Sequence, residues 1–204
     1  MLFRSRHLLA KRNLVARSPR QSNGMPALLR RSNMDYIFDI DGTLLDITHR
    51  LEFIESTPRG KKDYVRFRDP ELKKSDKPIL PVIYIMNALH YEGHQIIIAT
   101  GRTKDEQEDT RKSLAPHVPY ITEMAPDGDP DYLIPMYLRS RTDFRKDAIV
   151  KSMMLDRMRE DGYDPVMVFD DRPSVINMWH KRGLIVADMR DPEKEWEEKP
   201  WPKS

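Results

Sequence analysis

Cysteine is absent from this chain of 204 residues, so disulfide bonds and thiolate metal sites are excluded. Long apolar runs are absent too, because none approaches the roughly 18 residues of a transmembrane helix. Charged residues make up 33% of the chain, which is typical of a soluble protein. The length predicts one domain with tails. The lack of cysteine permits a reducing compartment, and we expect a cytoplasmic location without membrane attachment.

Acidic residues are missing from positions 1–34, which carry eight Lys and Arg. The rest of the chain holds 27 basic and 33 acidic residues, so the part that must fold is mildly acidic. The net charge of +2 is therefore weak support for nucleic-acid binding. Residues 1–33 are predicted to be a basic, disordered arm, and the alternatives are an organellar transit peptide or an upstream extension with the true start at Met25 or Met34. Residues 189–204 are predicted to be a polar tail.

Short apolar runs alternate with stretches of helical spacing from Asp35 onward. The predicted strands are 36–40, 95–100, 132–138, 166–170 and 184–187, and the predicted helices are 81–93, 103–115, 147–162 and 173–183. Pro135 weakens the third strand, whereas Thr103 and Glu106 form a capping box that favours the second helix. Alternating strands and helices predict an α/β fold with a parallel sheet and flanking helices.

Polar residues cluster where three of these strands end. The first strand leads to Asp39 and Asp41, the second to Thr100, Gly101 and Arg102, and the fourth to Asp170, Asp171 and Arg172. In open parallel sheets, ligands bind beyond these carboxyl ends. The four carboxylates would repel one another unless a cation lay among them. Without cysteine, and with only six histidines, Mg²⁺ fits best, with Asp39, Asp41, Asp170 and Asp171 as candidate ligands.

The two aspartates at the first strand suggest phosphate chemistry. Asp39 could attack phosphorus to give an aspartyl-phosphate, and Asp41 could protonate the leaving oxygen and then activate water. Mg²⁺ would neutralise the phosphate, Thr100 would offer a hydroxyl, and a lysine is still needed to hold the charge. Alone, Asp-x-Asp-Gly is usually a turn and a double aspartate often a helix cap. Three such motifs at strand ends, in this order, favour catalysis.

The motifs resemble those of the haloacid dehalogenase (HAD) phosphatase superfamily. "FDIDGTL" (38–44), "IIIATGR" (96–102) and "MVFDD" (167–171) are similar to its first, second and fourth motifs. "DFRKDAIVK" (143–151) and "DDRPSVINMWHKRG" (170–183) resemble segments of the 3′-phosphatase domain of phage-type polynucleotide kinase/phosphatase. The resemblance covers most of 35–187. It implies a HAD-like, Rossmannoid three-layer domain at 34–188 with a small cap inserted at 45–78.

The resemblance also implies roles for individual residues. Asp39 would be the nucleophile, Asp41 the general acid and base, and Lys151 the catalytic lysine, with Lys146 as its rival. Substrate or phosphate ligands are expected at Arg50, Gly101, Arg102, Asp147 and Arg172. Asp147 and Lys151 are four residues apart, which places them one turn apart on one helix face. One of Asp170 and Asp171 would bind Mg²⁺ and the other would orient Lys151 or Arg102.

The predicted cap bears on the substrate. A short cap leaves an open site, which suits a phosphate at the end of a polymer. Residues 59–77 include eight basic and four acidic side chains, with Tyr64 and Phe67 among them. Such a segment can bind a single strand through its backbone and bases. The alternative is a solvated loop with both aromatic rings in the core.

Three functions remain open. The first is a Mg²⁺-dependent 3′-phosphatase of DNA or RNA ends, in end healing before ligation. The second is a phosphatase of free nucleotides or other small esters, and the third is a non-catalytic nucleic-acid-binding protein. The related full-length enzymes also carry a kinase domain, but these residues contain no Gly-x-x-x-x-Gly-Lys-Ser/Thr motif, so kinase activity is not expected. The sequence leaves the oligomeric state open.

Overall fold

The computed structural model describes residues 33–55, 62–121 and 133–190. The predicted arm, apart from Asn33, and most of the predicted tail therefore lie outside the described residues. No helix within the described ranges is both long and apolar enough to cross a membrane.

Five parallel strands form one sheet in the order β5-β4-β1-β6-β7. They are β1 (Asp35–Phe38), β4 (Gln95–Thr103), β5 (Met136–Arg139), β6 (Pro165–Asp170) and β7 (Ile185–Asp188). The predicted parallel sheet is confirmed, and each predicted strand is present. The sheet order puts β1 in the centre, so Asp39 lies between the ends of β4 and β6.

All five observed strands differ from the predicted ones in their bounds, three of them by one or two residues at an end and two by more. The run at 132–138 forms a strand only after Pro135, and it lies at the edge of the sheet, where a proline is tolerated. β4 continues past Thr100 to Thr103 with a register shift against β5 between these two residues. This bulge contains Gly101 and Arg102, and bulges of this kind re-aim side chains near active sites.

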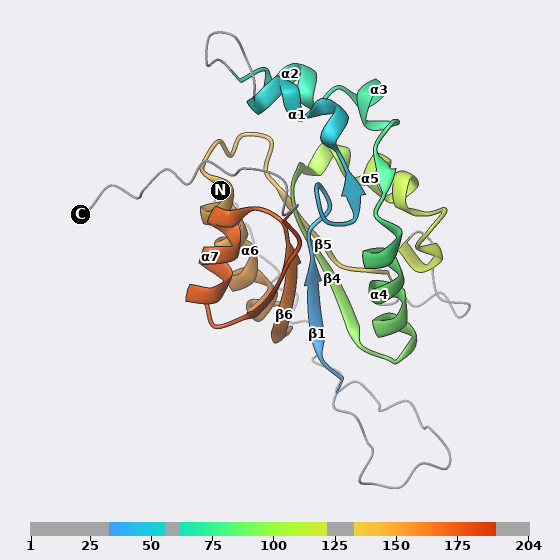
Figure 1. Ribbon diagram of the computed structural model, residues 1–204. Helices are drawn as coiled ribbons and strands as arrows, with labels where there is room; N and C mark the ends of the chain where they lie inside the picture. The colour runs from blue at the N-terminus through green and yellow to red at the C-terminus, as the bar shows by residue number, and fades with distance from the viewer. Residues whose placement is uncertain (1–32, 56–61, 122–132, 191–204) are drawn as a thin grey trace, which may run out of the picture. The chain divides into compact units, whose positions relative to one another are not determined.

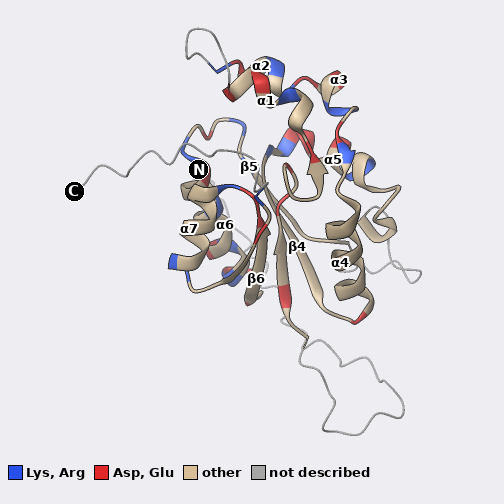
Figure 2. Cartoon of the chain, in the orientation of Figure 1, with Lys and Arg blue, Asp and Glu red and all other residues tan. Residues whose placement is uncertain are grey.

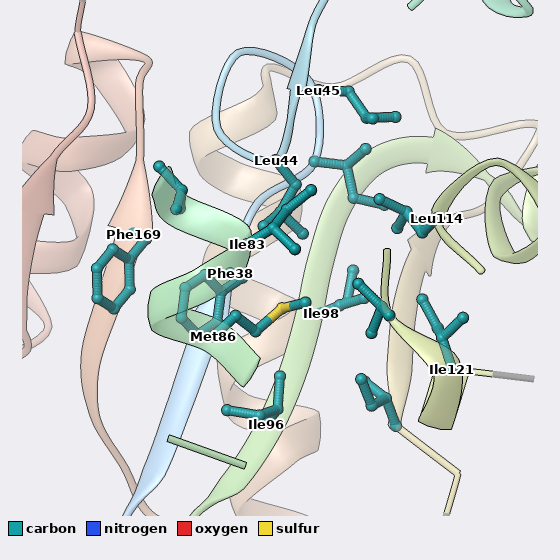
Figure 3. Packing of buried hydrophobic residues seen from close by; sticks show 14 of the residues in the cluster. Phe38, Leu44, Leu45, Ile83, Met86, Ile96, Ile98, Leu114, Ile121 and Phe169 are labelled. Carbon is teal, nitrogen blue, oxygen red and sulfur yellow. The ribbon is translucent and has the colours of Figure 1, made fainter. Parts of the chain in front are cut away.

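Alternating residues of the central strands supply two separate apolar cores. Phe38, Ile96 and Ile98 face one side of the sheet, where Phe38 stacks on Phe169 with ring centroids 4.3 Å apart (Figure 3). Ile37 and Ile97 face the other side. Phe38 and these four isoleucines are fully buried, and Phe169 is nearly so. Burial on both faces explains why these strands read as continuous apolar runs.

Helices cover both faces of the sheet, which gives the predicted three layers. The helices are α4 (Leu80–Tyr91), α5 (Gln107–Leu114), α6 (Asp147–Glu160) and α7 (Pro173–Lys181), with a 3-10 turn, η2 (Lys104–Glu106), ahead of α5 and another, η3 (Pro119–Ile121), behind it. α4 and α5 lie on one side of the sheet, and α6 and α7 lie on the other (Figure 1). The capping box of Thr103 and Glu106 is present as predicted.

The segment predicted to be a cap carries three short helices, α1 (Thr48–Glu55), α2 (Tyr64–Phe67) and α3 (Pro70–Lys73). Its ends are joined by an antiparallel pair, β2 (Leu45–Asp46) with β3 (Lys77–Pro78). The helices lie beyond the carboxyl end of β1 (Figure 1). This arrangement brings the segment over the edge of the sheet at which the polar motifs end.

Candidate active site

Asp39 follows β1 directly and is only 6% exposed. Its backbone N–H still pairs with β6, donating to Phe169 O at 3.0 Å, so the central sheet fixes its position. Its Oδ2 lies 2.9 Å from Lys151 Nζ, whereas its buried Oδ1 has no hydrogen-bond partner among the described residues. One oxygen of Asp39 is therefore neutralised and the other is available to a ligand.

Lys151 lies on α6, one turn after Asp147, and its side chain is 1% exposed. Nζ donates to Asp170 Oδ2 at 2.8 Å and also contacts Asp39. Burial alone would lower the pKa of Lys151, but the charges of Asp170 and Asp39 raise it, so the ammonium stays protonated. The rival Lys146 is exposed at the N-cap of α6. The structure therefore brings Lys151 to the aspartates.

Asp170 is held on both of its oxygens. Besides Lys151, Trp179 Nε1 donates to Oδ2 at 3.1 Å, and Arg172 N–H donates to Oδ1 at 3.1 Å. Trp179 is fully buried on α7, so its indole fixes the carboxylate from below the site. Asp170 thus orients Lys151, one of the two roles left open for this pair of aspartates. The sequence had shown Trp179 only as part of a motif, without a role.

Three carboxylates meet at this edge: oxygens of Asp39, Asp170 and Asp171 lie within 4.8 Å of one another. Burial and the neighbouring carboxylates raise the pKa of Asp39 well above its usual range, against the opposing charge of Lys151. Burial and Asp170 raise the pKa of Asp171 to about 6. A cation among these oxygens would relieve this repulsion, and the free Oδ1 of Asp39 offers it a ligand. The residues therefore fit Mg²⁺, which prefers oxygen donors.

Gly42 allows the Asp171 carboxylate to reach this group. A Cβ at position 42 would lie 2.1 Å from Asp171 Oδ2, and the backbone of Gly42 has a φ of +88°. Both the space and the conformation therefore require glycine here. The glycine of the Asp-x-Asp-Gly motif thus serves the approach of a residue 129 positions away as well as a turn.

Asp41 does not join the three carboxylates, although the sequence placed it among the metal ligands. Its Oδ1 accepts hydrogen bonds from Arg50 Nη2 at 2.6 Å and from Arg102 Nη2 at 2.6 Å. Burial would raise the pKa of Asp41, but Arg102 and Arg50 outweigh burial and hold it well below its usual range. The Asp41 carboxylate is therefore ionised and held by two arginines.

Asp76 completes this network, and no feature of the sequence marked it. It lies just before β3 with 1% of its side chain exposed. Its Oδ1 accepts from Arg50 Nε at 2.7 Å, and its Oδ2 accepts from Arg102 Nη2 at 2.8 Å. Asp41 at the end of β1 and Asp76 at the end of the cap segment thus share the same two arginines.

The structure places Arg50, a predicted substrate ligand, in the interior of this network. The Arg50 side chain is fully buried, and its remaining Nη1 donates to Phe67 O at 3.2 Å. Every nitrogen of its guanidinium is therefore in use within the protein, and the ring of Phe67 lies 4.5 Å below it. Arg50 positions Asp41 and the cap segment from the interior. Arg102, with 4% of its side chain exposed, is nearly as buried.

Asp147 forms a separate set of ion pairs, with Arg139 and Arg172. It accepts from Arg139 Nη2 at 2.6 Å and from Arg172 Nη1 at 2.7 Å. Gly101 permits this approach, because a Cβ there would lie 3.0 Å from Asp147 Oδ1. Thr100 is fully buried, and its Oγ1 accepts from Arg102 N at 3.2 Å. Arg139 was not predicted, although reading the end of the third strand as well would have found it.

A further ion pair joins the cap segment to the sheet. Lys73 Nζ on α3 pairs with Oε1 of Glu106, whose Oε2 accepts from the backbone of Thr103 at 2.6 Å. Burial and the charge of Arg102 lower the pKa of Lys73 to about 8. The end of α3 is thus fastened to the capping box that follows β4. Blue and red segments accordingly meet where the cap faces the sheet (Figure 2).

The first expected outcome concerns Asp76. Asp76→Asn leaves Arg50 and Arg102 with one carboxylate between them in a buried place, so the free energy of unfolding should fall by about 3 kcal/mol. Urea unfolding measures this loss. The matched control is Asp156→Asn, which breaks the exposed pair with Arg182 and should lose less than about 1 kcal/mol. Equally small losses would contradict a buried network.

The second outcome concerns the metal. Mg²⁺ in about hundredfold excess over its dissociation constant should stabilise the protein by about 2.7 kcal/mol and raise its melting temperature. Asp171→Asn should abolish this shift while leaving the metal-free protein folded, since it removes a buried carboxylate with a raised pKa. Asp156→Asn should keep the shift. Calorimetry that finds the same Mg²⁺ response in Asp171→Asn would remove Asp171 from the site.

Solved structures support the architecture. One chain of the Pnkp1/Rnl/Hen1 RNA repair complex aligns with a TM-score of 0.56 at 21% identity, over 84% of this chain and 47% of that chain. A class C acid phosphatase from Bacillus anthracis aligns with a TM-score of 0.54 at 15% identity, over 81% of this chain and 70% of that one. A haloacid dehalogenase-like hydrolase from Streptococcus pneumoniae gives 0.52 at 13% identity, over 76% and 83%.

At these identities the likeness shows the fold, and this chain spans about half of the repair-complex chain that it matches. The fold is that of the HAD-like phosphatases, as the sequence motifs predicted. A family model adds more than the fold. The model of the polynucleotide kinase PNKP phosphatase domain matches residues 33–193. Because this match spans most of the sequence, the chain belongs to the PNKP phosphatase-domain family of HAD-like phosphatases.

Proposed function

We propose that this protein is a Mg²⁺-dependent polynucleotide 3′-phosphatase that works through an aspartyl-phosphate on Asp39. The observation that carries the proposal is the position of Lys151, buried between Asp39 and Asp170. It neutralises one oxygen of Asp39, while the other has no partner among the described residues. Membership of the PNKP phosphatase-domain family supports the reaction class.

In the first half-reaction, an oxygen of Asp39 attacks phosphorus while the bond between phosphorus and the 3′-oxygen breaks. A metal ion held by Asp39 and Asp171, when bound, would neutralise charge on the phosphoryl oxygens. Lys151 stabilises the negative charge on Asp39 and on the phosphoryl group from the protein side. Asp170, held by Trp179, keeps the ammonium in place.

The leaving 3′-oxygen needs a proton, yet Asp41 is ionised in the free protein because Arg50 and Arg102 lower its pKa. A phosphate monoester has its second pKa near about 6, so part of the substrate arrives carrying a proton. We propose that the phosphate dianion also competes for the Arg102 guanidinium, which in the free protein donates to Asp41, Asp76 and Thr110 and would have to leave Asp41 to reach the substrate. Losing that hydrogen bond raises the pKa of Asp41, which can then accept the substrate proton and donate it to the 3′-oxygen.

In the second half-reaction, water attacks phosphorus, Asp41 takes a proton from this water, and the bond between phosphorus and Asp39 breaks. Asp41 passes this proton to the departing inorganic phosphate, so both aspartates return to their starting forms. The return of Arg102 to Asp41, at 2.6 Å in the free state, restores the ionised carboxylate. The two arginines therefore set the protonation state of Asp41 according to whether phosphate is bound.

Exposed side chains of the site and of the cap segment, together with the family, support a substrate whose phosphate is attached to a polymer. Arg172, with 43% of its side chain exposed, is a cation of the site that solvent reaches. In the cap, Tyr64 is 49% exposed with Arg68 over its ring at 5.9 Å, whereas Phe67 packs inward beneath Arg50. One of the two aromatic rings expected to contact a strand is thus turned to solvent. Lys61 lies outside the described residues.

The deciding experiment compares substrates under initial-rate conditions with Mg²⁺. The panel contains a 3′-phosphorylated single-stranded oligonucleotide, the same sequence with a 5′-phosphate, a 3′-mononucleotide and 4-nitrophenyl phosphate. The proposal expects kcat/KM to be highest for the 3′-phosphorylated oligonucleotide and lost in EDTA. A preference for the mononucleotide would favour the free-nucleotide phosphatase, and binding without any turnover would favour a non-catalytic protein.

Replacing the nucleophile should stop turnover. Asp39→Asn should lower kcat by at least about 10⁴-fold, since loss of the catalytic nucleophile of a well-studied protease costs about 10⁶-fold, while the urea midpoint is unchanged or higher. The fold is retained because a buried carboxylate with a raised pKa is replaced by a neutral group of the same shape. Residual activity above about 1% of the wild type in a preparation free of contaminating phosphatase would exclude Asp39 as the nucleophile.

The two candidate lysines can be separated directly. Lys151→Gln should lower kcat by about 10³-fold, because a charge is lost next to the developing negative charge. Lys146→Gln, at an exposed N-cap, should stay within about threefold of the wild type, since it lies outside the buried group. Urea unfolding of both variants distinguishes lost chemistry from lost folding. If Lys146→Gln were the more damaging in folded protein, Lys146 rather than Lys151 would be the catalytic lysine.

A further inference from the structure

The loop between β5 and α6, residues 140–146, displays an aromatic ring to solvent. Phe144 is 88% exposed, more than every other aromatic side chain of the described residues. Tyr91, the next, is 75% exposed. A phenylalanine has no polar group to benefit from water, so this exposure adds nothing to the core. The ring is therefore a candidate contact for something outside the domain.

The backbone on both sides of this ring is fixed. Arg139, only 7% exposed, donates from Nη1 to the carbonyl oxygens of Asp143 at 3.0 Å and Arg145 at 2.8 Å. The Asp143 carboxylate in turn accepts from Arg145 Nε at 2.9 Å and Nη2 at 2.6 Å. Phe144 lies between these two braced residues. Its presentation is thus built before any partner arrives, which lowers the entropy lost on binding.

The loop borders the proposed catalytic group. Arg139 also donates to Asp147 at 2.6 Å, and Asp147 begins the helix that carries Lys151. Figures 1 and 2 show the loop at the end of the sheet where the cap lies, with blue segments along it. Any chain that ends with its phosphate at Asp39 has its next residues near this edge.

The charges of the loop suit an anionic chain. Arg141, Arg145 and Lys146 are exposed, against the single acid Asp143, which is already paired with Arg145. A hydrogen bond from Thr103 is the main cause that lowers the pKa of Asp105, just after β4. The charges of Arg141 in the loop and Arg68 in the cap lower it further. The loop and the cap therefore flank the same stretch of chain after β4.

A hollow of about 520 Å³ accompanies the ring. It is lined by Ser140, Thr142, Asp143, Phe144 and Arg145. It is open to solvent, and its lining combines one aromatic face with hydroxyl and charged groups. Such a lining suits a nucleobase, which has an apolar face and a polar edge.

We propose that Phe144 stacks on a base near the 3′ end of a single-stranded substrate while Arg141 contacts a backbone phosphate of the same strand. This inference rests on the proposed function, because it supposes a polynucleotide with its 3′-phosphate at Asp39. It assigns binding of the strand to the β5–α6 loop, in addition to the cap segment, which the sequence predicted as the contact for a single strand. The stacking is independent of base identity, since every base has a π-face.

The test measures stacking directly. The full chain carrying Asp39→Asn, which binds without turnover, is titrated into 3′-phosphorylated ten-nucleotide oligonucleotides with 2-aminopurine at each of the three terminal positions. Binding should quench the fluorescence at one of them. Adding Phe144→Ala should remove the quench and raise Kd about 5- to 100-fold. Phe144→Trp should restore both, whereas Phe144→Leu, apolar but without a ring, should not.

Two controls separate this inference from the proposed function. Tyr91→Ala, which removes an exposed ring at the end of α4, should change neither quench nor Kd. With Asp39 intact, Phe144→Ala should lower the ratio of kcat/KM for the oligonucleotide to that for 4-nitrophenyl phosphate by the same factor as Kd. An abasic residue at the quenched position should raise the Kd of the wild type by that factor. It should leave the Kd of Phe144→Ala unchanged.

The outcomes are distinct. If the wild type prefers the oligonucleotide but Phe144→Ala binds and quenches normally, the stacking of Phe144 on a base is excluded while the proposed function stands. If the wild type shows no preference for the oligonucleotide, the proposed function itself fails. Unchanged strand binding by Phe144→Ala together with loss of a protein complex would assign the ring to a protein partner and overturn the inference. Arg141→Gln should flatten the salt dependence of Kd by about 0.7 in the log–log slope, and an unchanged slope excludes its phosphate contact.

Discussion

The ammonium group of Lys151, buried between Asp39 and Asp170, is the interaction on which the site depends. Without it, Asp39 and Asp170 would lose the ammonium that both of them contact while they face Asp171 at the end of the sheet, and burying such charges unpaired is unfavourable. Trp179 and the Arg172 backbone hold Asp170, Asp170 holds Lys151, and Lys151 leaves one oxygen of Asp39 without a partner among the described residues. Stability and chemistry thus share one arrangement.

The network of two arginines and two aspartates around Asp41 connects the site to the cap segment. Arg50 and Arg102 each bind both Asp41, from the sheet, and Asp76, from the end of the cap segment. In the proposed reaction, phosphate that competed for Arg102 would therefore disturb a bond to the cap and raise the pKa of Asp41 together. The protonation of the proposed acid and the hold on the cap are coupled, because they use the same guanidinium groups.

Strand ends were the informative part of the sequence. Parallel sheets bring those ends together, so Asp39 and Asp170 could be placed in one site from their motifs, whereas Lys151, on a helix, came only from the family resemblance, with Lys146 as its rival. Partners within the site were less accessible. Asp41 is held by Arg50 and Arg102, and these two arginines also bind Asp76, which no motif marks and which lies 35 positions after Asp41 in the chain. Phe144 is likewise an ordinary residue of a motif until its exposure is known.

The account is tested most directly by the proposed covalent intermediate. Wild-type protein and a 3′-phosphorylated oligonucleotide would be mixed with Mg²⁺, quenched in acid within a single turnover, digested and analysed by mass spectrometry. The account predicts a hydroxylamine-labile phosphate on the side chain of Asp39, formed and lost at rates compatible with turnover. Phosphate on another residue, or turnover without any phosphorylated protein in the quenched samples, would contradict it.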